Sequence, residues 1–261
     1  MALVDRLQRF LRLDASWTKG ETRTIRPFDL FLPTRARDSS EKAAFAIPSE
    51  PVDRDPDQAL EGMRAACRQR ECPLFVRYLD EFAPDFASTL ESRRFIAVER
   101  SPVLVCSPAT FRSAHLVPGA VPHVVTAEST QEQILIALDA NVRGFDPDAA
   151  PMTPSDAEDF REDLVEGRAF YVTIGEQAVA AGMCSAPIDG VTTLSGITTL
   201  VPFRRRGLAT FLTAHMTSAA FATGVDLAFL TAVDQRASAV YERVGFRRAA
   251  TYLEYRDLAS P

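Results

Sequence analysis

The stretch that decides the fold combines a strand, a basic turn and the start of a helix. It reads Gly196-Ile197-Thr198-Thr199-Leu200-Val201-Pro202-Phe203-Arg204-Arg205-Arg206-Gly207-Leu208-Ala209-Thr210. We expect the strand to cover residues 192–199 and the helix to run over residues 205–223. The first turn of a helix leaves backbone N–H groups unpaired at the positive end of the helix dipole. Because Gly207 lets an anion approach that backbone, the stretch predicts a phosphate-binding turn. The alternative is an ordinary connection with a solvated basic cap.

A second stretch lies one predicted strand further along the chain. It reads Asp234-Gln235-Arg236-Ala237-Ser238-Ala239-Val240-Tyr241-Glu242-Arg243-Val244-Gly245-Phe246 and predicts a helix over residues 237–244 with Gly245 as its C-cap. Together the two stretches resemble the GNAT family of acyl-CoA-dependent N-acyltransferases. Arg204-x-x-Gly207-x-Ala209 matches the pyrophosphate-binding signature of that family, (R/Q)-x-x-G-x-(G/A). Ala237-x-x-x-Tyr241-x-x-x-Gly245-Phe246 matches its second signature, so the resemblance covers about residues 123–257.

The resemblance implies that the matching positions bind acetyl-CoA. The strand backbone at Ile197, Thr198 and Thr199 would pair with the pantetheine arm, as an added strand does. Arg204 opens the signature, and the pyrophosphate would be held by the backbone amides of Arg205, Arg206, Gly207, Leu208, Ala209 and Thr210. Asp234 is a further cofactor-binding candidate, but it stands where the family often has Asn, and this departure leaves its contact open.

Tyr241 is the candidate catalytic residue. The resemblance places it where the family often has the general acid that protonates the departing CoA thiolate. The alternative is a packed aromatic ring with a hydrogen-bonded hydroxyl. The strand over residues 192–199 contains no Glu, Asp or His, so no general base is assigned. Deprotonation of the amine is left to a water held by Ser195 or by a threonine.

A predicted acidic helix over residues 155–165 lies in the region that helps form the acceptor pocket in this family. Its acidic residues are Asp156, Glu158, Asp159, Glu162, Asp163 and Glu166. They could favour a cationic amine as the acceptor. The alternative is a solvated helix face.

The order of predicted elements indicates an α/β protein with a mixed, mostly antiparallel central sheet flanked by helices. Two prolines and a glycine interrupt the pattern near residues 118–122, which we take as a linker. The expected domains are an N-terminal domain over residues 1–117 and a GNAT acetyltransferase domain over residues 123–261. The smaller N-terminal α+β half has no cofactor motif. It resembles the extra domain of two-domain members, and a degenerate copy of the same fold is one interpretation.

Composition excludes several classes of protein. The 261 residues are 46% hydrophobic and 25% charged, as in soluble globular chains, and no apolar run is long enough to span a bilayer. A charged N-terminus without a secretory signal predicts a cytoplasmic protein. The net charge of −6 disfavours nucleic-acid binding. The four cysteines form no CxxC pair and no histidine is spaced to complete a zinc site, so we expect no metal.

These observations predict an N-acetyltransferase that moves an acetyl group from acetyl-CoA to the primary amine of a small molecule by direct attack. We expect a monomer or a homodimer without nucleic-acid or membrane partners. Three alternatives stay open: acetylation of a protein N-terminus, transfer of a longer acyl chain, and a non-catalytic module that senses acyl-CoA.

Overall fold

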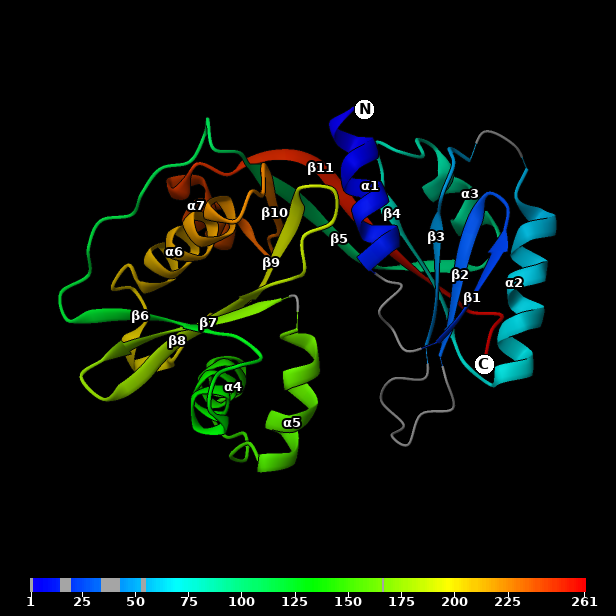
Figure 1. The fold of residues 1–261 in the computed structure, drawn as a ribbon. Coiled ribbons are helices and arrows are strands. Elements are labelled where there is room, and N and C mark those ends of the chain that lie inside the picture. The colour runs from blue at the N-terminus through cyan, green and yellow to red at the C-terminus, as the bar shows by residue number, and fades with distance from the viewer. Residues whose placement is uncertain (1, 15–19, 34–42, 53–54, 166) are drawn as a thin grey trace. The chain divides into compact units, whose positions relative to one another are not determined.

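The computed structural model describes residues 2–14, 20–33, 43–52, 55–165 and 167–261. The chain divides into two compact units, and the first is built from two separate segments. Unit 1 comprises Met1–Val103 and Ala249–Pro261, and unit 2 comprises Leu104–Arg248. Strands β5 (Phe95–Cys106) and β11 (Arg247–Asp257) therefore each contribute residues to both units (Figure 1).

The units differ from the domain limits expected from the sequence. The predicted linker at residues 118–122 lies inside unit 2, where residues 120–122 already belong to strand β6 (Ala120–Val125). Pro118 and Gly119 form a turn before the strand, with a positive φ of 74° at Gly119, and Pro122 lies within β6. Residues 249–261, which the sequence analysis places in the second domain, belong to the compact unit 1.

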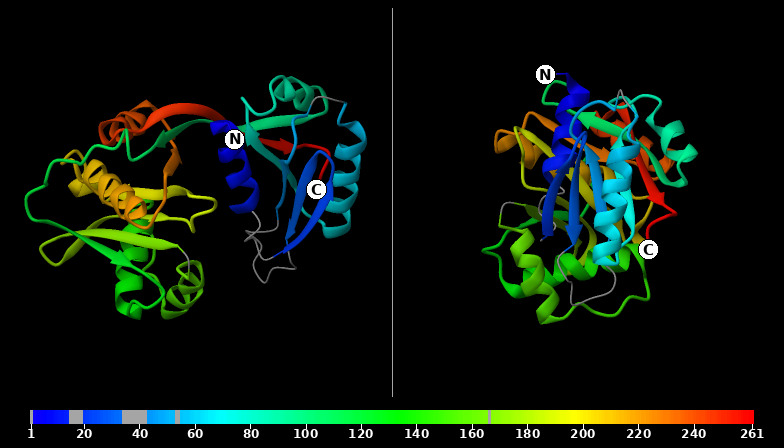
Figure 2. Two further views of the ribbon diagram at one scale, coloured as in Figure 1. Left: turned by 45° about the horizontal axis from the view of Figure 1, so that its top comes forward. Right: turned by 90° about the vertical axis from the view of Figure 1, so that its right-hand side faces the viewer.

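Unit 1 is a sheet with helices on both faces. Its helices are α1 (Leu3–Asp14), α2 (Asp57–Arg70) and α3 (Phe86–Ser92), and its strands are β1 (Gly20–Ile25), β2 (Phe28–Pro33), β3 (Ala44–Pro48) and β4 (Leu74–Leu79), with parts of β5 and β11. The strand order runs β1-β2-β3-β4-β11, and only the β3–β4 pair in this series is parallel. The first five residues of β2 are all buried, as expected for a strand covered on both faces. Figure 2 shows the strands of unit 1 between α1 and α2.

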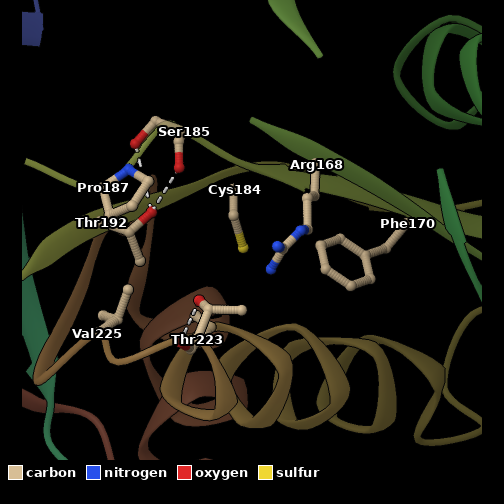
Figure 3. A pocket seen from close by; sticks show the side chains of 9 residues that line it. Arg168, Phe170, Cys184, Ser185, Pro187, Thr192, Thr223 and Val225 are labelled. Atoms are coloured by element: carbon tan, nitrogen blue, oxygen red, sulfur yellow. Dashed lines mark hydrogen bonds between the residues drawn. The ribbon is translucent and has the colours of Figure 1, made fainter. Parts of the chain in front are cut away.

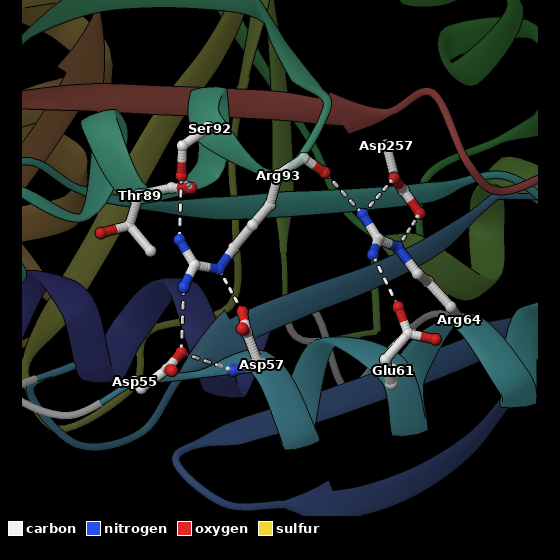
Figure 4. Close-up of polar contacts among 8 residues, drawn as sticks. All are labelled: Asp55, Asp57, Glu61, Arg64, Thr89, Ser92, Arg93 and Asp257. Carbon is white, nitrogen blue, oxygen red and sulfur yellow. Dashed lines mark hydrogen bonds and ion pairs between the residues drawn. The ribbon is translucent and has the colours of Figure 1, made fainter.

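The end of β11 is held in unit 1 by a buried ion pair. Arg64 of α2 donates from Nε and one terminal nitrogen to the two carboxylate oxygens of Asp257, at 2.9 and 3.0 Å (Figure 4). The Asp257 side chain is fully buried, and Arg64 also donates to the Arg93 carbonyl at 2.7 Å. Such a bidentate pair fixes geometry as well as charge. Leu253 and Tyr255 of the same strand are buried in the unit 1 core.

Unit 2 also has strands with helices on both faces. Its helices are α4 (Gln131–Phe145), α5 (Pro154–Asp163), α6 (Leu208–Ala222) and α7 (Gln235–Val244), and its strands are β6, β7 (Arg168–Ile174), β8 (Gln177–Cys184), β9 (Val191–Thr199) and β10 (Leu227–Thr231), with parts of β5 and β11. The strand order β10-β9-β8-β7-β6 is antiparallel except for the parallel β9–β10 pair. Figure 1 shows α4 and α5 on one face and α6 and α7 on the other.

Alternating side chains of β7 build the two cores of unit 2. Phe170 and Val172 pack in the cluster that includes α6, while Ala169 and Tyr171 pack in the cluster that includes α4. This is the alternation of period two that a strand covered on both faces requires.

The two units repeat one order of elements. Three strands, a helix, a strand, a helix and a strand follow one another as β1-β2-β3-α2-β4-α3-β5 and again as β7-β8-β9-α6-β10-α7-β11. In both series the third and fourth strands form the parallel pair. The predicted fold class is confirmed: the protein is α/β, with a mostly antiparallel sheet flanked by helices and an N-terminal copy of the same pattern.

Within the part of the chain that the structure describes, no helix is long and apolar enough to cross a membrane. Over the same residues, no group of three or more His, Cys, Asp or Glu side chains is arranged to hold a metal ion.

Candidate active site

The turn between β9 and α6 has the form of an anion site. A short 3₁₀ segment (Val201–Phe203) follows β9, and α6 begins only at Leu208. The helix predicted from residue 205 thus starts later, because Arg205 and Gly207 have positive φ values of 65° and 84° that no right-handed helix continues through. Gly207 is the N-cap residue, and as a glycine it has no side chain that could cap the helix. The amides at the start of α6 are therefore available to a bound anion.

The three arginines of the turn have different surroundings. Arg204 donates from Nε to the Thr199 carbonyl at 3.0 Å and from a terminal nitrogen to the Gly144 carbonyl at 2.8 Å. It therefore ties the turn to the end of β9 and to α4. The Arg206 guanidinium lies 5.0 Å from the Phe203 ring centroid and donates to the Pro202 carbonyl. Arg205 is exposed, and its side chain makes no hydrogen bond or ion pair with the described residues, which leaves it available to a phosphate.

Strands β9 and β10 separate just before this turn. Their parallel pairing ends at Thr193 and Phe229, although β9 continues to Thr199 and β10 to Thr231. The second half of β9 therefore has one backbone edge paired with β8 and the other edge free of β10. Near the end of this edge the Thr199 hydroxyl is buried without a hydrogen-bond partner among the described residues. A pantetheine arm fits such an edge, because its amides can pair with strand backbone.

A β-bulge bends β9 at this open edge. The β8–β9 register shifts between Ala181 and Met183, opposite Gly196, whose φ is 61°. Asn141 of α4 donates from Nδ2 to the Gly196 carbonyl at 2.5 Å. A β-carbon on Gly144 would lie 2.3 Å from the Thr198 hydroxyl oxygen, so α4 approaches β9 closely there. These contacts fix the backbone on both sides of Ile197.

Sequence reasoning missed the residues that hold this bulge. The signal available for Gly196 was its place inside a predicted strand, since a glycine there often marks a bulge. Asn141 and Gly144 carry no such signal, because only the packing of α4 on β9 brings them to the site.

Tyr241 lies on α7 and packs against the core cluster that contains α6. Its ring is half-buried, and its centroid lies 6.3 Å from that of Phe246. Burial, and secondarily the charge of Asp234, raise the pKa of the Tyr241 phenol. Its hydroxyl makes no hydrogen bond with the described residues. The phenol is therefore neutral at physiological pH and can donate a hydrogen bond.

Asp234 has a local structural role. It is the N-cap of α7, and its Oδ1 accepts from the Ala237 amide at 2.7 Å. This bond uses the carboxylate where a family member with Asn would use an amide oxygen. Any contact of Asp234 with the cofactor stays a prediction.

The acidic helix is observed as α5, and its charges are mostly exposed. Asp156 forms a capping box with Thr153, and hydrogen bonds from Thr153 lower the pKa of its carboxyl group. Glu158 and Asp159 are exposed, and Glu166 lies outside the described residues. On β9 the side chain of Ser195 is exposed, so a water can reach it.

Unit 1 has the same parallel strand pair, but its open end is filled. The β3–β4 pairing ends at Ala46 and Val76. Just beyond, the buried side chain of Gln8 donates to the Pro48 carbonyl at 2.9 Å and accepts from the Leu79 amide at 3.0 Å. Gln8 of α1 thus occupies backbone groups that correspond to those left free in unit 2.

The helix start that follows β3 is also unsuited to a phosphate. Asp55 accepts from the Asp57 amide at 3.1 Å at the start of α2, so a carboxylate of the chain already binds there. Arg93 neutralises both carboxylates through ion pairs with Asp55 and Asp57 (Figure 4). Because Arg93 is already paired with these two carboxylates, it is not available to an incoming phosphate.

Comparisons with known proteins agree with this geometry. Residues 171–255 match the family model described as FR47-like protein. A GCN5-related N-acetyltransferase from Kribbella flavida is 27% identical, with a TM-score of 0.80 over 99% of this chain and 96% of that chain. A tandem GNAT protein from the clavulanic acid biosynthesis pathway is 13% identical, with a TM-score of 0.67 over 90% of this chain and 79% of that chain. No curated protein matches this chain in sequence.

A third similar structure extends the same result. A GCN5-related N-acetyltransferase from Sphaerobacter thermophilus is 14% identical, with a TM-score of 0.63 over 90% of this chain and 80% of that chain. The predicted resemblance to the GNAT family is confirmed, because the family model covers both signatures and the similar structures include GCN5-related N-acetyltransferases and a tandem GNAT protein.

Proposed function

We propose that this chain, which has the GNAT fold, transfers an acetyl group from acetyl-CoA to the primary amine of a small molecule. The observation that carries the proposal is the free edge of β9, which leads directly into the uncapped start of α6 at Gly207. That edge offers backbone pairing to the pantetheine arm, and the helix start offers amides to the pyrophosphate. Unit 1 would bind no second cofactor.

The transfer would proceed by direct attack of a neutral amine on the thioester carbonyl. Binding both reactants side by side supplies proximity. The backbone amide of Ile197, held next to the bulge at Gly196, would polarise the carbonyl as negative charge develops on its oxygen. Tyr241 would donate a hydrogen bond to the departing sulfur. Water at the exposed Ser195 would accept the amine proton.

A screen of amines tests this function directly. Purified protein would be incubated with acetyl-CoA and a panel of small primary amines, and release of the CoA thiol would be measured. Turnover of a small amine supports the proposal. Turnover only with peptide N-termini or only with longer acyl-CoA would favour the corresponding alternative activity. Tight acetyl-CoA binding without turnover of any acceptor would favour a sensing module.

We expect one acetyl-CoA to bind per chain. Gln8 fills the open end of β3–β4, and carboxylates occupy the start of α2, so among the residues that the structure describes only those of unit 2 offer a free site. Isothermal titration calorimetry should therefore give a stoichiometry near one. Gln8→Ala should lower stability, since it leaves the Pro48 carbonyl and the Leu79 amide unpaired, and should not create a second site. A stoichiometry of two in the unaltered protein would contradict this assignment of unit 1.

We expect Asn141→Ala to lower kcat by about 10-fold, because the bulge at Gly196 loses the bond that fixes it. Acetyl-CoA affinity should change by less than about 3-fold, since most of the free edge and the helix start are untouched. Asp139→Ala is a matched control, because Asp139 accepts from the Met152 amide at 2.8 Å on the same helix but away from the bulge. An equal loss of kcat in both variants would mean that Asn141 only stabilises α4 and does not position the bulge.

A further inference from the structure

Unit 2 contains a cavity at the end of α6 that is remote from the Gly207 turn. The cavity has a volume of about 120 Å³ and lies between the last turn of α6 and the sheet strands β7, β8 and β9 (Figure 3). Because α6 has 15 residues, roughly 22 Å separate its two ends. The volume is well below the ~300–1,000 Å³ of pockets for drug-sized ligands, so it holds no pantetheine or adenine. The cavity is therefore separate from the candidate active site.

Arg168 is the one cationic side chain that lines this cavity. It is the first residue of β7, it is half-buried, and Figure 3 shows its guanidinium directed into the space between Cys184 and Thr223. Among the described residues it makes no hydrogen bond and no ion pair. By contrast, Arg161 and Arg204 both donate to backbone carbonyls. A half-buried guanidinium without acceptors is unfavourable, so a bound acceptor would stabilise it.

The end of α6 does not need Arg168 as a cap. The Ala220 carbonyl accepts from the Thr223 amide at 3.0 Å, the Thr223 hydroxyl at 2.8 Å and the Val225 amide at 3.4 Å. The Phe221 carbonyl accepts from the Gly224 amide at 3.1 Å. Carbonyl groups that a cation often caps at a helix end are thus already paired within the chain.

The hydroxyl groups that line the cavity have used their donors. The Thr192 hydroxyl donates to the Ser185 carbonyl at 2.9 Å, and the Ser185 hydroxyl donates to the Ala186 carbonyl at 3.2 Å. Burial raises the pKa of the Cys184 thiol to about 12, so this group adds no negative charge. The remaining lining is apolar and includes Phe170 and Val225. The cavity therefore offers one charged hydrogen-bond donor, Arg168, next to an apolar lining.

We propose that this cavity binds a short monocarboxylate whose carboxylate group pairs with Arg168 and whose apolar tail fills the space against Phe170 and Val225. A guanidinium recognises a carboxylate through two parallel hydrogen bonds. An apolar cavity of about 150 Å³ in another protein accepts benzene, so this smaller space suits a branched tail of about four carbons. Isovalerate is the probe that follows from these dimensions. The site is additional to the proposed acetyl-transfer function and does not depend on it.

The test is a titration of the ¹⁵N-labelled protein with isovalerate, followed by NMR, with isovaleramide as the neutral analogue of the same shape. We expect saturable shifts at the Arg168 side chain and at residues around the cavity, with millimolar or tighter affinity, as is usual for so few atoms. Isovaleramide should not saturate at about 20 mM, because it lacks the charge that Arg168 recognises. Added acetyl-CoA should not displace isovalerate.

Three variants distinguish specific binding in this cavity from a general attraction of the anion to positive charge. Arg168→Gln should weaken isovalerate binding by about 10- to 100-fold through loss of the charged pair. Ala220→Leu, which fills the cavity and keeps the arginine, should weaken it similarly. Arg143→Gln, at an exposed cation on α4, should leave the affinity unchanged.

Several results would overturn the proposal. They are absence of saturable shifts in the unaltered protein at about 20 mM, equal binding of isovaleramide, and unchanged affinity in folded Arg168→Gln. Displacement by acetyl-CoA would also overturn it, because the probe would then lie in the candidate active site. If a variant does not fold, the comparison of isovalerate with isovaleramide in the unaltered protein still decides whether the cavity recognises a carboxylate. Each of these outcomes can be interpreted even if the protein transfers no acetyl group, because binding of isovalerate is measured directly.

Discussion

Replacement of Gly207 by Asp is expected to abolish acetyl-CoA binding while the protein stays folded. Gly207 has a φ of 84° and caps α6, so its substituent lies beside the amides that would hold the pyrophosphate. A carboxylate there repels the phosphates and competes for the same amides. The loss of affinity should exceed about 100-fold, which corresponds to about 2.7 kcal/mol. Calorimetry with acetyl-CoA measures it.

The matched control for this prediction is Gly207→Asn. Asparagine has the same shape as aspartate, and both tolerate a positive φ better than most residues. A β-carbon at this position would lie 3.7 Å from a Val117 methyl carbon, which is an ordinary contact, so both variants should fold. Asn should retain much more affinity than Asp, because only Asp adds charge. Wild-type affinity in a folded Gly207→Asp protein would contradict the assignment of the phosphate-binding turn.

The Tyr241→Phe variant should lower kcat by roughly 10- to 1,000-fold, at or below the usual range for acid catalysis. A phenol with a pKa of ~10 gives its proton to a thiolate with a pKa of ~8.5 only at a cost of about 2 kcal/mol. The structure raises the pKa of Tyr241 through burial, which makes full proton transfer less favourable still. Tyr241 therefore acts best by donating a hydrogen bond as charge develops on sulfur.

The pH dependence provides a second measurement for Tyr241. Because its pKa is raised, the phenol keeps its proton through pH 7 to 9 and loses it only above the usual value of ~10. The kcat of the unaltered protein should therefore not fall over that range through loss of this proton. Tyr241→Phe should lower kcat evenly across it, and acetyl-CoA affinity should barely change. An unchanged kcat, with chemistry shown to be rate-limiting, would mean that Tyr241 only packs in the core and takes no part in the reaction.

The local parts of the site were predictable because their causes are local. A glycine after three arginines, at the junction of a strand and a helix, indicates an anion-binding turn whatever the rest of the chain does. The exact start of α6 was not predictable, since Arg205 adopts a positive φ that its residue type disfavours. The use of Asp234 as an N-cap follows from the ordinary preference of Asp for that position.

The parts that sequence reasoning missed depend on contacts between distant segments. Asn141 reaches Gly196 across 55 residues, and Gln8 reaches the Leu79 amide across 71 residues. Neither contact leaves a periodic pattern or a motif in the sequence. The limits of the units were missed for the same reason, because nothing local in residues 249–261 shows that they complete the first unit.

The division of unit 1 into two segments has a consequence for biosynthesis. During translation, residues 1–103 leave the ribosome first, but their sheet lacks β11 until residues 249–257 have been made. The ion pair of Arg64 and Asp257 joins residues 193 positions apart. Unit 2 is contained in residues 104–248, which emerge as one uninterrupted segment. The half of the protein that is synthesised first should therefore be the last to reach its native state on the ribosome.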